Sequence, residues 1–232
     1  MLTIILLFRY FSRHPEEWKK QSRRLKNQFS FFAAGKRKVI LLILLAVVVC
    51  CLNSAAQQMR FRVVRNDEVI GHVLANQVKQ QEITSISIES LTKIKLLWGF
   101  SINIKQADTF SNGLLTAAYF NKVINNKEKL CHRMQWCRSF YHVRRKGDED
   151  LRQPQPVYYT TSSLYFTEPV NITDVYSPNF LAFGKMRKVA INKYELQLPD
   201  GNKNYYSYKN GICEKVEVNT DWATVFFINE KF

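Results

Sequence analysis

The feature of this chain that most constrains its fold is a two-residue alternation of apolar and polar side chains, which recurs between turn signals. Phe100, Ile102 and Ile104 are separated by polar residues, and so are Tyr194 and Leu196. Successive side chains of a strand point to opposite faces, so this period predicts half-buried antiparallel strands. We therefore predict a mainly β protein with a single curved antiparallel sheet or half-barrel of about ten strands.

Residue pairs that accept positive φ angles stand between the alternating segments. The strongest are Asn112-Gly113, Asp200-Gly201 and Asn210-Gly211, and Asn66-Asp67 and Asn125-Asn126 are weaker examples. Such pairs are typical of tight hairpin turns. They predict that neighbouring strands in the sequence also pair in the sheet.

Three segments depart from regular alternation. The apolar phase of 84–96 slips at Leu91, which predicts a strand with a β-bulge that bends the sheet. Residues 130–141 also match helical spacing, but we favour a hairpin through Trp136 to Ser139. Residues Thr160 to Phe166 are the best candidate for a short helix, with Pro169 ending it. One or two short helices are therefore expected beside the sheet.

Residues 36–56 have the layout of a secretory signal peptide. Three basic residues at 36–38 precede the apolar run Val39 to Leu52, and the small residues Ser54 and Ala56 follow it. This run is shorter than the ~20 residues that cross a bilayer. We predict export across the inner membrane, cleavage after Ala56, and a periplasmic or secreted protein. The alternative is an uncleaved anchor in the inner membrane.

The leader also defines the expected domains: an N-terminal extension at 1–35, the signal peptide at 36–56 and an exported β domain at 57–232. We interpret the extension as a start codon assigned too early, with a cytoplasmic tail of an anchored protein as the alternative. Of the net charge of +15, +8 lies in residues 1–56. Because the remaining charge is scattered, no nucleic-acid partner is predicted.

No catalytic, cofactor or metal motif stands out in the exported part. It contains Cys131, Cys137 and Cys213, whose pairing the sequence leaves open. In one straight strand Cys131 and Cys137 would lie ~20 Å apart, so only a hairpin between them would permit a disulfide. The spacing of these cysteines to His142 suggests zinc only weakly, because paired zinc ligands usually stand closer in sequence. A hydrolase that uses a cysteine or zinc is the less favoured alternative.

The alternating strands predict a concave apolar surface. Its expected residues are Phe100, Ile102, Tyr165, Tyr194 and Leu196. One short helix near Leu164 is expected to be too small to cover this surface, and a large exposed apolar patch normally has an occupant. We therefore predict a non-catalytic envelope protein that binds a lipid-like or other hydrophobic ligand. A structural or protein-interaction module, with the sheet rolled onto a full core, is the alternative.

Three stretches resemble a particular family: 66–71 (NDEVIG), 163–169 (SLYFTEP) and 198–211, which begins LPDG and ends in Tyr-x-Tyr-x-Asn-Gly. Together they resemble an uncharacterised family of exported β-rich proteins from Bacteroidota, over nearly all of residues 59–232. More remotely, the start of the domain is similar to half-barrel lipoprotein carriers of the LolA type. That resemblance implies a curved sheet whose concave side faces a helix or an apolar ligand. The long strand-rich C-terminal half departs from those carriers.

Overall fold

The computed structural model of the chain describes residues 54–94, 99–147, 150–220 and 223–232. The chain divides into two units, Met1–Asn53 and Ser54–Phe232, and the second contains all the described residues. The predicted leader therefore lies outside the described residues except for its last three positions. Among the described residues, no helix is long and apolar enough to cross a membrane.

The second unit is built almost wholly of strands. They are β1 (Ser54–Arg65), β2 (Glu68–Gln80), β3 (Ile83–Ile94), β4 (Phe100–Ser111), β5 (Leu114–Ile124), β6 (Lys127–Trp136), β7 (Tyr141–Arg145), β8 (Leu151–Gln153), β9 (Asp174–Ser177), β10 (Ala182–Ala190), β11 (Lys193–Gln197), β12 (Lys203–Lys209), β13 (Ile212–Thr220) and β14 (Ala223–Asn229). A 3₁₀ helix, η1, spans Ser163–Tyr165. The prediction of a mainly β fold is confirmed.

The fourteen strands of the described residues belong to one antiparallel sheet that is not closed into a barrel. Its order is β8-β7-β6-β5-β4-β3-β2-β1-β14-β13-β12-β11-β10-β9. The first strand pairs with the last, with Phe61 opposite Asn229, so the two edges come from the middle of the chain. Our expectation of about ten strands was too low. Strands as short as β8 and β9 contain too few residues to show an alternating pattern.

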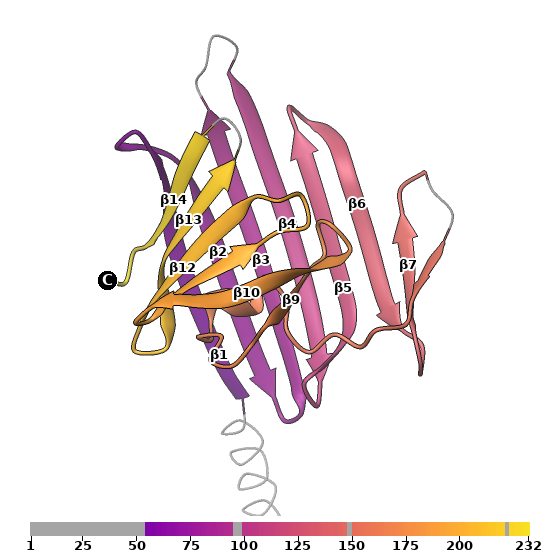
Figure 1. Cartoon of the computed structure of the whole chain (residues 1–232). Coiled ribbons are helices and arrows are strands. Elements are labelled where there is room, and N and C mark those ends of the chain that lie inside the picture. The colour runs from indigo at the N-terminus through magenta and orange to yellow at the C-terminus, as the bar shows by residue number, and fades with distance from the viewer. Residues whose placement is uncertain (1–53, 95–98, 148–149, 221–222) are drawn as a thin grey trace, which may run out of the picture. The chain divides into compact units, whose positions relative to one another are not determined.

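The sheet folds back over itself. In Figure 1 the orange and yellow strands β9–β14 lie in front of the purple and magenta strands of the first half. Buried side chains from both halves belong to one hydrophobic cluster, which contains Phe61, Val73 and Ile88 from the first half and Leu196 and Val216 from the second. The second half of the sheet, rather than a helix, therefore covers the inner face of the first half.

The predicted hairpin turns are confirmed. Positive φ angles occur at Asn66 and Asp67, at Asn112 and Gly113, and at Asn210 and Gly211. The hairpin expected after Trp136 is also present, because β6 ends there and β7 begins at Tyr141.

The bulge predicted near Leu91 is wrong. Strand β3 pairs with β2 and β4 without a change of register, and Leu91 lies exposed on the outer face. The apparent slip is one apolar residue on the solvent side of a regular strand, while Ile86 and Ile88 remain buried. Bulges occur elsewhere, including one in β2, where Ile70 is the extra residue opposite Val63 and Val64 of β1.

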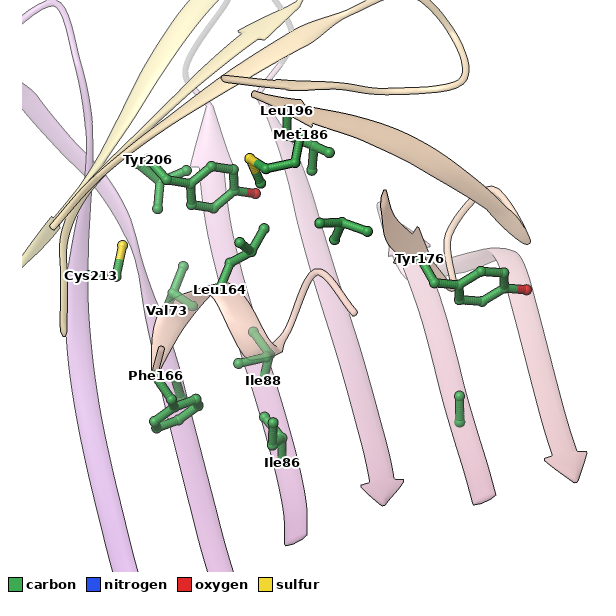
Figure 2. Close-up of a cluster of buried hydrophobic side chains, with 14 of the residues drawn as sticks. Val73, Ile86, Ile88, Leu164, Phe166, Tyr176, Met186, Leu196, Tyr206 and Cys213 are labelled. Atoms are coloured by element: carbon green, nitrogen blue, oxygen red, sulfur yellow. The ribbon is translucent and has the colours of Figure 1, made fainter. Parts of the chain in front are cut away.

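The connection from β8 to β9, residues 154–173, fills the space between the two halves of the sheet. It includes η1, so the predicted short helix is present but is a single 3₁₀ turn. Figure 2 shows Leu164 and Phe166 of this connection lying between side chains of the two halves. The Tyr208 hydroxyl donates to the Leu164 carbonyl at 2.8 Å, which ties the connection to β12. This part of the interior is thus filled by the chain's own side chains.

Candidate ligand-binding site

Of the five residues predicted to form one apolar surface, three belong to or pack against the hydrophobic core and two do not. Tyr194 and Leu196 are buried in the hydrophobic core. Tyr165 is half-buried and packs edge-on against Phe61, with 5.2 Å between ring centroids. Phe100 and Ile102 are half-buried at the start of β4 and do not belong to that core.

The cysteines and histidines are also distributed differently from a metal site. Cys131, Cys137 and Cys213 are free thiols. The turn of the β6–β7 hairpin follows Cys137, because its backbone N–H donates to the Phe140 carbonyl, so Cys131 and Cys137 do not face each other across that hairpin. His132 is buried, and its Nδ1 lies 2.9 Å from the Pro178 carbonyl oxygen. Among the described residues no group of three or more His, Cys, Asp or Glu side chains could hold a metal ion.

A groove of about 850 Å³ lies over strands β4 to β7, and we call it the β4–β7 groove. Its residues are Ala107, Thr109, Ala117, Ala118, Tyr119, Arg133, Met134, Gln135, Cys137, His142 and Arg144. The volume is within the range of ~300–1,000 Å³ that is usual for small-molecule sites. The groove is therefore the best candidate for a binding site in the described part of the chain.

Two cross-strand rows of side chains form this groove on the outer face of the sheet; Ala118 and Met134 also border it, although their side chains are buried on the inner face. Strand register places one row as Ala107, Tyr119, Arg133 and Arg144, and the other as Thr109, Ala117, Gln135 and His142. Both rows begin with small or apolar residues on β4 and β5 and end with polar or basic residues on β6 and β7. The small side chains of Ala107 and Ala117 leave room above the strands, and both are exposed.

The basic side chains of the groove contact an aromatic ring and a carboxylate. The guanidinium carbon of Arg133 lies 5.5 Å from the centroid of the Tyr119 ring, which is a cation–π distance. Asp150 approaches from beyond β7, with its Oδ2 3.4 Å from His142 Nε2 and 3.7 Å from Arg144 Nε. These distances exceed those of strong charge-assisted hydrogen bonds, so the Asp150 carboxylate neutralises Arg144 only weakly.

The inner face of the same strands carries a different cluster. Asp108, Ala118, Met134 and Val143 form one cross-strand row, and all four are buried. Asp108 Oδ2 accepts hydrogen bonds from Gln106 at 2.7 Å, and from Thr160 at 2.7 Å and Ser162 at 2.5 Å. The last two residues belong to the 154–173 connection. Asp108 therefore fastens that connection to β4.

Burial also changes the acidity of this carboxyl. It raises the pKa of Asp108, although the three hydrogen bonds act in the opposite direction. The second oxygen, Oδ1, is buried and has no hydrogen-bond partner among the described residues. All three hydrogen-bond donors therefore contact Oδ2. They offset only part of the free energy that burial of the charged carboxylate costs.

Local patterns in the sequence point to both clusters, although neither cluster was predicted. The alternation that begins at Phe100 continues through Gln106 and Asp108 to Phe110, which already places Asp108 on the buried face. Arg133 and Gln135 alternate with His132 and Met134, but the helix-like spacing of 130–141 obscured this pattern. Which strands lie beside β6 could not be deduced from such local patterns.

The fold and this site define an all-β, single-sheet protein with an outer-face groove. Residues 61–229 match the DUF6134 family, a domain of unknown function, and the chain belongs to that family. The predicted likeness to an uncharacterised β-rich family is confirmed to this extent.

Similarity to other known proteins is sparse. No curated protein matches the chain. A crystal structure of a β-barrel-like protein of domain of unknown function DUF1849 from Brucella abortus is similar, with a TM-score of 0.46 and 7% identity. That similarity covers 74% of this chain and 94% of the other.

Proposed function

We propose that this protein is an exported, non-catalytic binding protein that holds a lipid-like, amphiphilic ligand in the β4–β7 groove. The observation that carries the proposal is the groove itself, whose volume suits a small molecule and whose alanines leave apolar space above β4 and β5. The filled interior supports an outer site, because core side chains already occupy the region beneath Leu164 and Phe166.

The export part of the proposal is supported by the signal-peptide layout of residues 36–56. Strand β1 begins at Ser54, and its pairing with β2 continues from Gln57 to Arg65. Cleavage after Ala56 would therefore remove only the first three pairs of this ladder. Mass spectrometry of the protein from its native envelope fraction is expected to find Gln57 as the first residue. A product that retains residues before Lys36 would favour the membrane anchor.

Ligand binding can be tested at a thiol inside the groove. Cys137, just after β6, is exposed and lines the groove, whereas Cys131 on β6 is not among the groove residues. Alkyl-chain amphiphiles, such as decyl phosphate and decyl maltoside below their micelle concentrations, are added to the full chain during alkylation by N-ethylmaleimide. We expect at least one of them to slow alkylation of Cys137 tenfold or more while Cys131 is unaffected, as peptide mass spectrometry would show.

A matched pair of variants locates the effect. Ala117→Trp places a large ring in the groove, whereas Ala190→Trp places the same ring at an exposed site on β10. Protection of Cys137 is expected to disappear in Ala117→Trp and to persist in Ala190→Trp. If neither amphiphile protects Cys137 in the native chain, the proposed function is wrong.

A second candidate function is a thiol hydrolase, because the structure brings Cys137 and His142 to the same groove. The Cys137 thiol, however, donates to the Gln135 carbonyl at 3.7 Å, and a backbone carbonyl is not a general base that could activate it. Hydrolysis of short nitrophenyl esters by the native chain, abolished in Cys137→Ser, would favour this candidate over binding. Stoichiometric zinc in the purified protein, lost on the same substitution, would favour its metal-dependent form.

A further inference from the structure

Two arginines face each other across neighbouring strands in the β4–β7 groove. Arg133 on β6 and Arg144 on β7 are register partners on the outer face of the sheet. Like charges placed directly opposite each other destabilise a strand pair. The arrangement is therefore unfavourable by itself and becomes favourable when an anion lies between the two side chains.

The lining of the groove does not offset this charge, and the carboxylates near it, Glu128 and Asp150, lie outside the lining. The eleven residues that line the groove include Arg133, Arg144 and His142 but no carboxylate. Asp150 contacts this basic group from outside the lining, and its carboxylate is 48% exposed and reaches Arg144 only at 3.7 Å. A better-placed oxyanion can thus replace Asp150 without breaking a strong ion pair.

The Arg133 side chain is held over the groove by Tyr119 of β5, on the side away from Arg144, and its guanidinium group lies near the apolar half of the groove. Its position over the Tyr119 ring restricts the guanidinium group, so less conformational freedom is lost when an anion binds. Guanidinium groups present parallel N–H donors that match carboxylate and phosphate oxygens. The pair of arginines fits an oxyanion better than a neutral polar group.

The two rows of the groove also give the ligand a direction. The row that ends at Arg133 and Arg144 begins with Ala107 and Tyr119, and the neighbouring row begins with Thr109 and Ala117. The apolar half thus lies over β4 and β5 and the cationic half over β6 and β7. An amphiphile that lies across the strands would contact both halves.

We infer that the ligand is an anionic amphiphile, whose carboxylate or phosphate lies between Arg133 and Arg144 and whose apolar chain runs across the strands toward Ala107. This inference rests on the proposed function, since it specifies the ligand of the same groove. It makes the charge of the headgroup the main determinant of specificity, and it makes binding sensitive to ionic strength.

The test uses the full chain and the protection of Cys137 from alkylation. The probes are decyl phosphate, decanoate, decyl maltoside and inorganic phosphate. We expect half-maximal protection by decyl phosphate at a concentration at least tenfold lower than by decyl maltoside, and at a higher concentration when salt is raised. Comparison of decyl phosphate with decanoate tells which oxyanion the site prefers.

Substitutions then assign the effect to the arginine pair. Arg133→Gln and Arg144→Gln are each expected to weaken protection by decyl phosphate about tenfold, a loss typical of one charged partner. Arg133→Lys keeps the charge but loses the paired donors, so an intermediate loss is expected. Arg62→Gln, at an exposed arginine on β1, is the matched control and is expected to change nothing.

The outcomes separate this inference from the proposed function. One outcome is that decyl maltoside and decyl phosphate protect Cys137 equally, with no effect of Arg133→Gln or Arg144→Gln. That result would contradict the inference that the ligand is anionic, but it would agree with the proposed binding of an amphiphile. Protection by inorganic phosphate at the same concentration as decyl phosphate would overturn the apolar half of the site. Absence of protection by every probe would overturn the inference together with the proposed function.

Discussion

The two faces of strands β4 to β7 differ although their residues alternate along the same four segments. The inner row contains the buried acid Asp108, and the adjacent outer row contains the exposed bases Arg133 and Arg144. Three hydrogen-bond donors contact Oδ2 of the buried Asp108 carboxyl, while its Oδ1 has no donor among the described residues. The outer arginines face each other in water, which screens their repulsion. Burial, rather than the type of charge, decides which group affects stability and which remains available to a ligand.

The largest expected difference between the two faces is in how much a bulky substitution lowers stability. Two adjacent alanines, one on each face, allow the comparison. Ala118 is buried at 5% exposure, whereas Ala117 is exposed in the groove. Ala118→Trp is expected to lower the free energy of unfolding by about 3 kcal/mol or more, because the core has no space for the ring. Ala117→Trp should change it by less than about 1 kcal/mol. Urea denaturation checks both, and equal losses would mean that the faces are assigned wrongly.

The next effect concerns the fastening of the 154–173 connection. Asp108→Ala removes the acceptor of Gln106, Thr160 and Ser162, which leaves buried donors unpaired. We expect a loss of about 2–3 kcal/mol in the free energy of unfolding. Asp174→Ala is the control, because that carboxylate is exposed and its ion pair with Lys185 should contribute less than about 1 kcal/mol. A fully stable Asp108→Ala protein would contradict the role of this carboxyl.

The third effect is the pH dependence of the inner face. Burial raises the pKa of Asp108 above the unfolded value of 3.8, so the folded state binds its proton more tightly than the unfolded chain. The resulting stabilisation is complete below pH 3.8 and is lost as the pH rises through the folded pKa. Asn at this position cannot titrate. The stability of Asp108→Asn relative to the native protein should therefore rise with pH over this window.

Urea titrations of both proteins at several pH values measure that difference, and contributions from other groups cancel in it. If the stability of Asp108→Asn relative to the native protein falls as the pH rises, the hydrogen bonds to Oδ2 lower the pKa of Asp108 by more than burial raises it.

The smallest effect is expected on the outer face. Arg144 is 72% exposed, and Arg144→Gln should change the free energy of unfolding by less than about 0.5 kcal/mol. The same variant is expected to lose anionic ligand, so binding and stability should separate on this face. A loss of stability comparable to that of Asp108→Ala would show that the groove is structural.

Much of the fold could be predicted from local patterns. Period-two alternation and the turn pairs at 112–113 and 210–211 indicated the class of fold and the hairpins, because these features depend on neighbouring residues. The strand count and the bulge at Leu91 were wrong because short strands give little alternation and one exposed leucine imitates a slip. The proposed site was missed because its residues come from four strands.

The sequence by itself determined that the chain forms antiparallel strands joined by tight turns, since φ preferences and alternation act within a few residues. Only the tertiary structure decided that β1 pairs with β14 and that the second half of the sheet covers the first. This packing of one half of the sheet on the other buries Tyr194 and Leu196, which the sequence suggested as a ligand surface. It leaves the outer face of β4–β7 open. The reason is physical: alternation tells which residues share a face, but only long-range packing tells which face is removed from water.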